Sequence, residues 1–428
     1  MVFAIALPMT LAYMTTPLLG LVDTAVVGRL GDAAQLGGLA VGAVAFDIVF
    51  AFFPLRASTT GLVAQALGRG DGEEQRAVFL RSLIVAVVCG LVLLFGAPLV
   101  IAIANAAMDL PAGVATAMAS YITIRMVAAP FTLLNYTVLG WLLGLGRAKT
   151  GLAVQAVLGA INIVLSLWLG LWLGWGLEGV AWATVAAEAL TAMLGLYLYR
   201  RATGGETPIS RVRIANRAAL LRLFQVNRDV MIRSMILLFA FAFHTAQGAT
   251  FGETTLAANA ILMNFFMVSG FLLDGFATAA EQLVGRAIGA HYRPAFRAAV
   301  RYTLLWGAAL ALVLALIFVT LGSTLIDILT INEAVRAQAN LYLLWAAATA
   351  VTGVLAFQMD GVYIGATWSA TMRNMMILSL IVYLAVWWLA APSMGNHGLW
   401  LALNVFLAIR GVTLSARLPH HARMAFGS

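Results

Sequence analysis

The stretch "AQALGRGD" (Ala64–Asp71) has a counterpart in "GRAIGAHY" (Gly285–Tyr292), and the two together decide the fold. When Gly68 is placed on Gly289, the offset between the stretches is 289 − 68 = 221 residues. Each stretch ends an apolar segment and leads into a polar turn. The pair indicates that the second half of the chain repeats the first.

Two further matches support this duplication. "GWLLG" (Gly140–Gly144) corresponds to "GVYIG" (Gly361–Gly365) at the same offset of 221, and "GLEGVAWA" (Gly176–Ala183) corresponds to "GNHGLWLA" (Gly395–Ala402) at 219. Gly and Ala are common in membrane helices, so one match alone carries little weight. A nearly constant offset across three separated patches indicates an internal repeat.

The composition defines a polytopic membrane protein. The chain has 428 residues, of which 63% are hydrophobic and 10% charged, whereas soluble domains have roughly 45–50% apolar and about 25% charged residues. The net charge of +8 does not indicate a nucleic-acid partner, because most Arg residues lie between apolar segments. The single cysteine, Cys89, excludes an intramolecular disulfide.

Twelve apolar segments are long enough to span a bilayer as helices, which takes about 20 residues each. We expect them near 3–30, 34–67, 78–105, 115–143, 151–174 and 178–199, and then near 222–250, 255–288, 298–325, 336–363, 370–390 and 396–416. The longest should tilt or bend. Pro8, Pro17, Pro54 and Pro130 are natural kink points.

The distribution of basic residues predicts the orientation. With a cytoplasmic N-terminus, 21 of the 25 Lys and Arg residues fall in cytoplasmic loops or at cytoplasmic helix ends. The other four are Arg29, Arg56, Arg125 and Arg336. The positive-inside rule then predicts an inner-membrane protein with both termini in the cytoplasm. Because six spans per half is an even number, the repeats are parallel, related by an axis along the membrane normal.

A basic, polar stretch divides the two halves. It begins with "RRATGGETP" at Arg200 and contains Gly-Gly and Pro, which are typical of a linker. We therefore expect an all-α protein with an N-terminal six-helix lobe at 1–199, a cytoplasmic linker at 200–221 and a C-terminal six-helix lobe at 222–428.

Asp23, in "LLGLVDTAVVG" (Leu18–Gly28), is a carboxylate inside an otherwise apolar span. A charge there costs about 2.5–3.5 kcal/mol even on the lenient insertion scale, so buried membrane carboxylates are by default functional. One interpretation is a proton- or cation-binding group facing an internal cavity. The alternative is a structural ion pair with Arg56 on the next span. Both can hold, because protonation of Asp23 could release Arg56.

The remaining intramembrane charges have no charged counterpart at their repeat-related positions, so the polar site is not duplicated. Asp47 and Arg56 are nine residues apart on one span, roughly 180° around a helix, and cannot pair with each other. We weigh Arg56 as a structural or gating partner against a substrate contact. For Asp47 and Asp274, a structural role and a position in the cavity are equally well supported by the sequence.

The uncharged polar residues do not define a functional site by themselves, and the sequence contains none of the enzyme motifs considered. Asn162 and Thr184, taken alone, are typical of bonds between or within membrane helices. There is no phosphate-binding loop ending in Lys-Ser or Lys-Thr, no His or Cys cluster for a metal and no nucleophile elbow. The sequence therefore predicts a protein that is not an enzyme and has neither cofactor nor metal centre.

Seven stretches together resemble the multidrug and toxic compound extrusion (MATE) family, specifically its DinF-like branch. They are "ALPM" (Ala6–Met9), "PLLGLVDTAVVG" (Pro17–Gly28), "STTGLVAQALG" (Ser58–Gly68), "LGWLLGLGRA" (Leu139–Ala148), "GLEGVAWATVAAE" (Gly176–Glu188), "LDGFATAAE" (Leu273–Glu281) and "MDGVYIGAT" (Met359–Thr367). The resemblance covers essentially the whole chain. It implies two six-helix lobes in a V around an internal cavity. It also implies antiport, in which a cation enters while an organic compound leaves.

The resemblance also implies roles for individual residues. Asp23 matches the first-helix carboxylate that carries the proton, and Asn162 and Thr184 match polar residues around it. Ser166 stands where many relatives have Asp. Because Ser does not titrate and a hard cation such as Na⁺ favours several oxygen ligands, we expect H⁺ rather than Na⁺ as the coupling ion.

The predicted partners are an amphipathic, often cationic, small organic compound and membrane lipids, with the protein expected as a monomer. A related fold that flips lipid-linked oligosaccharides is the alternative. It would need basic residues facing a pyrophosphate, whereas the cavity candidates are mostly acidic. A membrane-embedded enzyme would need a catalytic pair at one depth, and the sequence offers none.

Overall fold

The computed structural model describes residues 1–204, 206 and 209–427, and this part of the chain contains helices but no strands. Gly205, Thr207 and Pro208 of the predicted linker, and Ser428, lie outside the described residues. The helices form two compact units. The N-terminal unit is Leu11–Leu67 with Asp71–Asn227, and the C-terminal unit is Met1–Thr10, Gly68–Gly70 and Arg228–Ser428. The predicted lobe boundaries stay a prediction.

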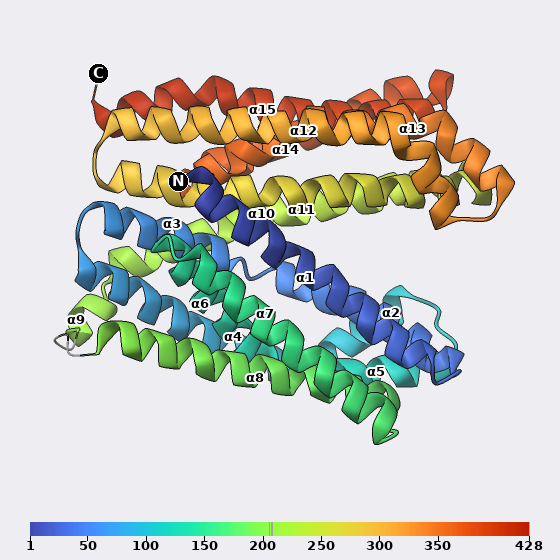
Figure 1. The fold of residues 1–428 in the computed structure, drawn as a ribbon, viewed down its shortest axis with the longest axis horizontal. Helices are drawn as coiled ribbons and strands as arrows, with labels where there is room; N and C mark the ends of the chain where they lie inside the picture. Colours follow the sequence, from blue (N-terminus) through green and yellow to red (C-terminus); the bar gives the residue numbers. More distant parts are fainter. Residues whose placement is uncertain (205, 207–208, 428) are drawn as a thin grey trace. The chain divides into compact units, whose positions relative to one another are not determined.

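Helices of the first half follow the predicted apolar segments (Figure 1). They are α1 (Val2–Gly28), α2 (Ala33–Ala51), α3 (Leu55–Gly68), α4 (Gly72–Ala107), α5 (Ala112–Val127), α6 (Ala129–Gly144), α7 (Ala148–Leu165), η1 (Ser166–Trp172) and α8 (Gly176–Thr203).

Helices of the second half are mostly longer and unbroken. They are α9 (Arg211–Ile214), α10 (Arg217–Ala249), α11 (Glu253–Gly289), α12 (Arg293–Leu329), α13 (Glu333–Gly365), α14 (Ser369–Met394) and α15 (Asn396–Phe426). Among the described residues, 11 helices or helix pairs are long and apolar enough to cross a membrane, or 12 with the bent pair α5–α6. The predicted all-α fold with about twelve spans is confirmed.

Two predicted spans of the first half are broken at proline. Segment 34–67 divides into α2 and α3 just before and after Pro54, which cannot donate a backbone hydrogen bond. Segment 115–143 divides into α5 and α6, which meet at Ala128 with a bend of 52°. Pro130 occupies the first turn of α6, where its ring excludes continuation of the preceding helix. By contrast, α1 continues through Pro8 and Pro17.

The predicted repeat is visible as equivalent close contacts between helices. In the N-terminal unit, a Cβ placed on Gly140 of α6 would lie 2.5 Å from the carbonyl oxygen of Arg56. In the C-terminal unit, a Cβ on Gly361 of α13 would collide with the carbonyl oxygen of Ala277. Both residues of the second contact are 221 positions beyond those of the first.

A second pair of contacts follows one turn later with the same offset. A Cβ on Gly144 would lie 2.9 Å from the carbonyl oxygen of Thr60, and one on Gly365 would collide with that of Glu281. Each half therefore uses a Gly-x-x-x-Gly face to bring two helix backbones together, as small residues do in membranes.

A shorter loop in the second half explains why the offset between the repeats decreases from 221 to 219 residues near the end of each half. Three residues, Leu173–Trp175, connect η1 to α8, whereas only Gly395 connects α14 to α15. Beyond these loops the contacts match again: Gly179 packs on Leu169 and Gly398 packs on Ala390. The first half thus has two extra residues in one loop.

Part of the predicted linker packs on the N-terminal unit. Arg81 of α4, only 3% exposed, donates to the carbonyl oxygens of Arg213 and Ile214 in α9, at 2.8 and 3.2 Å. Its Nη1 also lies 2.7 Å from Glu74. Arg213 in turn pairs with Asp71 and Glu73 at the start of α4.

Replacing Arg81 by Gln should lower the free energy of unfolding by about 3 kcal/mol, because it breaks a buried ion pair and leaves backbone carbonyls without a donor. Thermal unfolding of the purified protein in detergent measures this. Arg211→Gln is the matched control, since Arg211 is exposed on the same α9 helix. Equal melting temperatures for the two variants would contradict the contact's importance.

Candidate ion-coupling site

Asp23 is held by a residue of the fifth predicted span. Its side chain is half-buried on α1, and its Oδ1 accepts a hydrogen bond of 2.9 Å from the hydroxyl of Ser166. Ser166 itself is fully buried. The structure thus brings the predicted coupling carboxylate and the predicted Ser together across two helices.

The second polar pair lies one turn away from Ser166. Asn162 Nδ2 donates to the Thr184 hydroxyl of α8 at 2.8 Å, and that hydroxyl donates to the carbonyl oxygen of Val180 at 3.1 Å. Asn162 and Ser166 are four residues apart, so they share one face of their helix. The Oδ1 of Asn162 is buried and has no hydrogen-bond partner among the described residues. A free acceptor therefore lies one turn from the Asp23 contact.

Ser166 is also the point where the helix changes type. The α-helix α7 ends at Leu165, and residues Ser166–Trp172 form the π-helix η1. The prediction of one regular span at 151–174 therefore missed this change. Wider π-helical turns are rare and often occur at functional sites, since they re-aim side chains and loosen the backbone bond pattern.

Arg125 of α5 interacts electrostatically with Asp23, and it is not among the predicted site residues. It is 8% exposed and its guanidinium lies 4.0 Å from the centre of the Phe46 ring. Its Nε and Nη1 are buried without a hydrogen-bond partner among the described residues. Its charge acts on three carboxylates, namely Asp23, Asp47 and Glu188.

Glu188 of α8 is the second residue that sequence reasoning missed as a site. It is buried, and its Oε2 accepts a hydrogen bond of 2.5 Å from Asn135 of α6. The same Asn135 amide also donates to the Glu188 carbonyl oxygen at 3.0 Å. Glu188 appeared only inside a family-like stretch. A charged residue in the middle of an apolar helix was the available signal.

The other predicted residues are distributed differently. Arg56 lies 5.7 Å from the centre of the Tyr13 ring of α1, and the Asp47 side chain is exposed on α2. Asp274 belongs to α11 of the C-terminal unit, where it interacts electrostatically with Arg410. It is therefore not part of the cluster around Asp23 within the N-terminal unit.

The C-terminal unit contains its own buried ion cluster around Asp360. Oδ2 of Asp360 accepts from Arg233 at 2.5 Å and also from Arg410. Two guanidinium groups on one carboxylate oxygen indicate a structural role for Asp360. Asp23, by contrast, accepts its hydrogen bond from a neutral hydroxyl.

These features define a class of protein. Repeated sets of membrane-spanning helices, together with a half-buried carboxylate inside one span, are typical of secondary transporters.

Comparison with known sequences gives the family. The sequence model of the MatE family matches residues 8–168 and 230–389. The chain therefore belongs to the MatE family, whose members are membrane transporters and not enzymes.

Similar proteins cover nearly the whole chain. DNA damage-inducible protein F of Escherichia coli K12 is 37% identical over 433 residues, which is 98% of this chain and 92% of the relative. The probable multidrug resistance protein NorM of Deinococcus radiodurans is 28% identical, over 97% of this chain and 94% of its own. The predicted resemblance to the MATE family and its DinF-like branch is confirmed.

Solved structures share the fold. A multidrug resistance MATE family transporter of the MOP superfamily in an outward-facing conformation gives a TM-score of 0.90 at 17% identity, covering 100% of this chain and 96% of that one. A MATE protein in a bent conformation gives 0.92 at 16% identity, with 99% and 95% covered. At these identities the likeness establishes the fold alone.

Proposed function

We propose that this protein exports amphipathic, often cationic, organic compounds across the inner membrane in exchange for protons. The observation that carries the proposal is the hydrogen bond between Asp23 of one apolar span and Ser166 of another. The relatives named for multidrug resistance support the substrate class.

The exchange follows from competition for one carboxylate. Charged Asp23 attracts a cationic compound, while Asn162 Oδ1 offers it a neutral acceptor. A proton that binds Asp23 removes this attraction, so the compound leaves. Because proton and compound exclude one another at the same group, binding of either weakens binding of the other.

Ser166 and Arg125 shape this competition. The Ser166 hydroxyl donates to Asp23 and so fixes the position of the carboxylate. Arg125 supplies positive charge when no compound is bound, which limits the cost of a bare carboxylate in an apolar span. An uncharged hydroxyl at position 166 gives a single titrating group in this contact, which favours H⁺ over Na⁺ as the coupling ion.

Transport by purified protein in liposomes tests the proposal. A fluorescent cationic dye is driven separately by an imposed pH gradient and by an imposed Na⁺ gradient. We expect the pH gradient to drive uptake. Transport driven by Na⁺ alone would overturn the choice of ion, and failure of both would favour the lipid-linked oligosaccharide flippase.

Arg125→Gln should lower proton-driven dye transport roughly tenfold, within the usual range of couplings between sites. The physical reason is that Asp23, Asp47 and Glu188 lose a shared positive charge. Arg29→Gln is the control, because Arg29 is exposed beyond the end of α1. Initial transport rates are compared at equal amounts of reconstituted protein. An unchanged rate for Arg125→Gln would show that Arg125 has no role in the site.

A further inference from the structure

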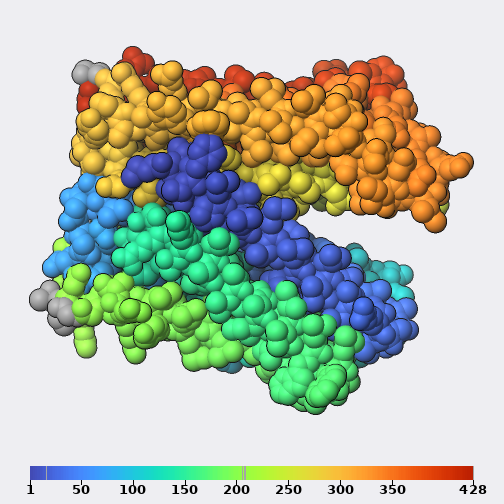
Figure 2. Space-filling view, in the orientation of Figure 1, coloured from blue at the N-terminus to red at the C-terminus, as the bar shows by residue number. Residues whose placement is uncertain are grey.

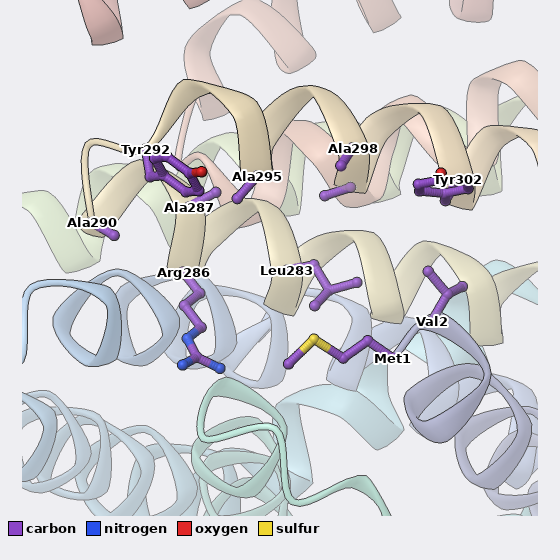
Figure 3. A pocket seen from close by; sticks show the side chains of 11 residues that line it. Met1, Val2, Leu283, Arg286, Ala287, Ala290, Tyr292, Ala295, Ala298 and Tyr302 are labelled. Atoms are coloured by element: carbon purple, nitrogen blue, oxygen red, sulfur yellow. The ribbon is translucent and has the colours of Figure 1, made fainter.

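A pocket of about 450 Å³ lies between the start of α1, the end of α11 and the start of α12, all within the C-terminal unit. Figure 3 shows α12 with Tyr292 and Tyr302 along one side, and Met1 and Val2 of α1 on the other. The volume falls in the range of ordinary ligand pockets. None of these residues belongs to the Asp23 cluster.

Aromatic contacts bound the pocket at one end. Phe3 of α1 packs edge-on against Phe276 of α11 and Trp306 of α12, with ring centres 5.7 and 4.7 Å apart. This packing places the first residues of α1 against α12, as their neighbouring surfaces show (Figure 2). Toward the helix ends the facing side chains are small, including Ala287 and Ala298, so space remains.

The walls are mostly apolar, with one charged group. Leu283, Val2 and the alanines provide hydrocarbon surface, and Arg286 is the single charged side chain of the lining. Arg286 is exposed, and no ion pair joins it to another described residue. It extends from α11 away from α12 (Figure 3). An apolar pocket with one cationic side chain that has no ion pair favours a ligand with a chain and an anionic head.

The surroundings match the edge of a membrane. Tyr292 and Tyr302 are 58% and 50% exposed, and half-exposed tyrosines are typical of the bilayer interface. Arg297 is also exposed on α12, but it does not line the pocket. Under the predicted orientation this end faces the cytoplasm, where the leaflet carries anionic lipids that basic residues attract.

We propose that this pocket binds an anionic phospholipid of the cytoplasmic leaflet, with an acyl chain between α1, α11 and α12 and the phosphate on Arg286. Binding there ties the start of α1 to α11 and α12. The proposal is independent of the coupling ion and of the compound transported.

Native mass spectrometry of the delipidated full chain in detergent tests it, with phosphatidylglycerol and phosphatidylcholine titrated in parallel. We expect phosphatidylglycerol to bind about fivefold more tightly, the attraction of one basic residue to an anionic headgroup. Arg286→Gln should remove this preference, whereas Arg297→Gln, a control on the outer face of α12, should keep it. Ala298→Trp, which fills the pocket, should weaken binding of both lipids.

Three results would overturn the proposal. Equal affinity of the wild-type protein for both lipids would remove the role of the charge. Loss of the preference in Arg297→Gln but not in Arg286→Gln would place the lipid outside the pocket. Displacement of the lipid by millimolar inorganic phosphate would indicate a site for free phosphate instead.

Discussion

Asp23→Asn should reduce proton-driven dye transport about 100-fold, near the upper end of the usual coupling between two ligands, because the group that both proton and compound bind is lost. Asn has nearly the same shape and can still accept the hydrogen bond from Ser166, so the helices should remain packed. It cannot exchange a proton at any working pH. Initial rates of dye uptake into liposomes under a pH gradient measure the loss.

Asp32→Asn is the matched control for this variant. Asp32 lies nine residues further along, in the loop before α2, where it accepts backbone hydrogen bonds from Ala34 and Gln35. These bonds, of which that from Gln35 has the largest effect, hold the pKa of Asp32 below its ordinary value. Asp32 therefore stays charged throughout the assay. Asn is an equally good cap, so the helix is kept. Wild-type transport by Asp23→Asn would show that its proton is not coupled to export.

Gly361→Leu should prevent accumulation of folded protein, and Gly361→Ala should lower the free energy of unfolding by about 3 kcal/mol, the upper part of the usual cost of overpacking. A Cβ at this position meets the backbone of Ala277 on α11, and a backbone cannot move aside as a side chain can. Gly140→Ala should behave similarly, because it adds a Cβ against Arg56 at the equivalent contact.

Gly96→Ala provides the comparison for these glycine variants. Gly96 lies inside α4, and a Cβ added there would meet nothing within 4 Å. Since Ala is a better helix former than Gly, this variant should be as stable as the wild type or slightly more so. Melting temperatures in one detergent measure the three alanine variants, and the yield of folded protein measures Gly361→Leu. A Gly361→Ala protein as stable as Gly96→Ala would contradict the close contact of α11 and α13.

The helical fold was predictable because its signals are local or periodic. Apolar length alone gives the spans, and the repeated glycines anticipated the contacts at Gly140 and Gly361. The division at Pro54 followed from proline chemistry. The π-helix at Ser166 could not be predicted, because no residue type requires it and tertiary packing decides the turn.

The site was predictable only in part. A carboxylate such as Asp23 is recognisable in one span, because its cost is independent of its neighbours. The role of Arg125 depends on which carboxylates the fold brings near it, and those lie on α1, α2 and α8. Sequence spacing carries no information about such contacts between distant helices. Glu188 differs from Arg125, because a charge inside an apolar span was available in the sequence as a signal for it, as for Asp23.

The most direct test of the central claim is to count protons when dye binds. Purified protein in weakly buffered detergent is mixed with a saturating cationic dye, and the change in pH is recorded for the wild type and for Asp23→Asn. We expect the wild type to release protons and the variant to release none. Equal release by both proteins, or dye binding to the wild type without release, would contradict this claim.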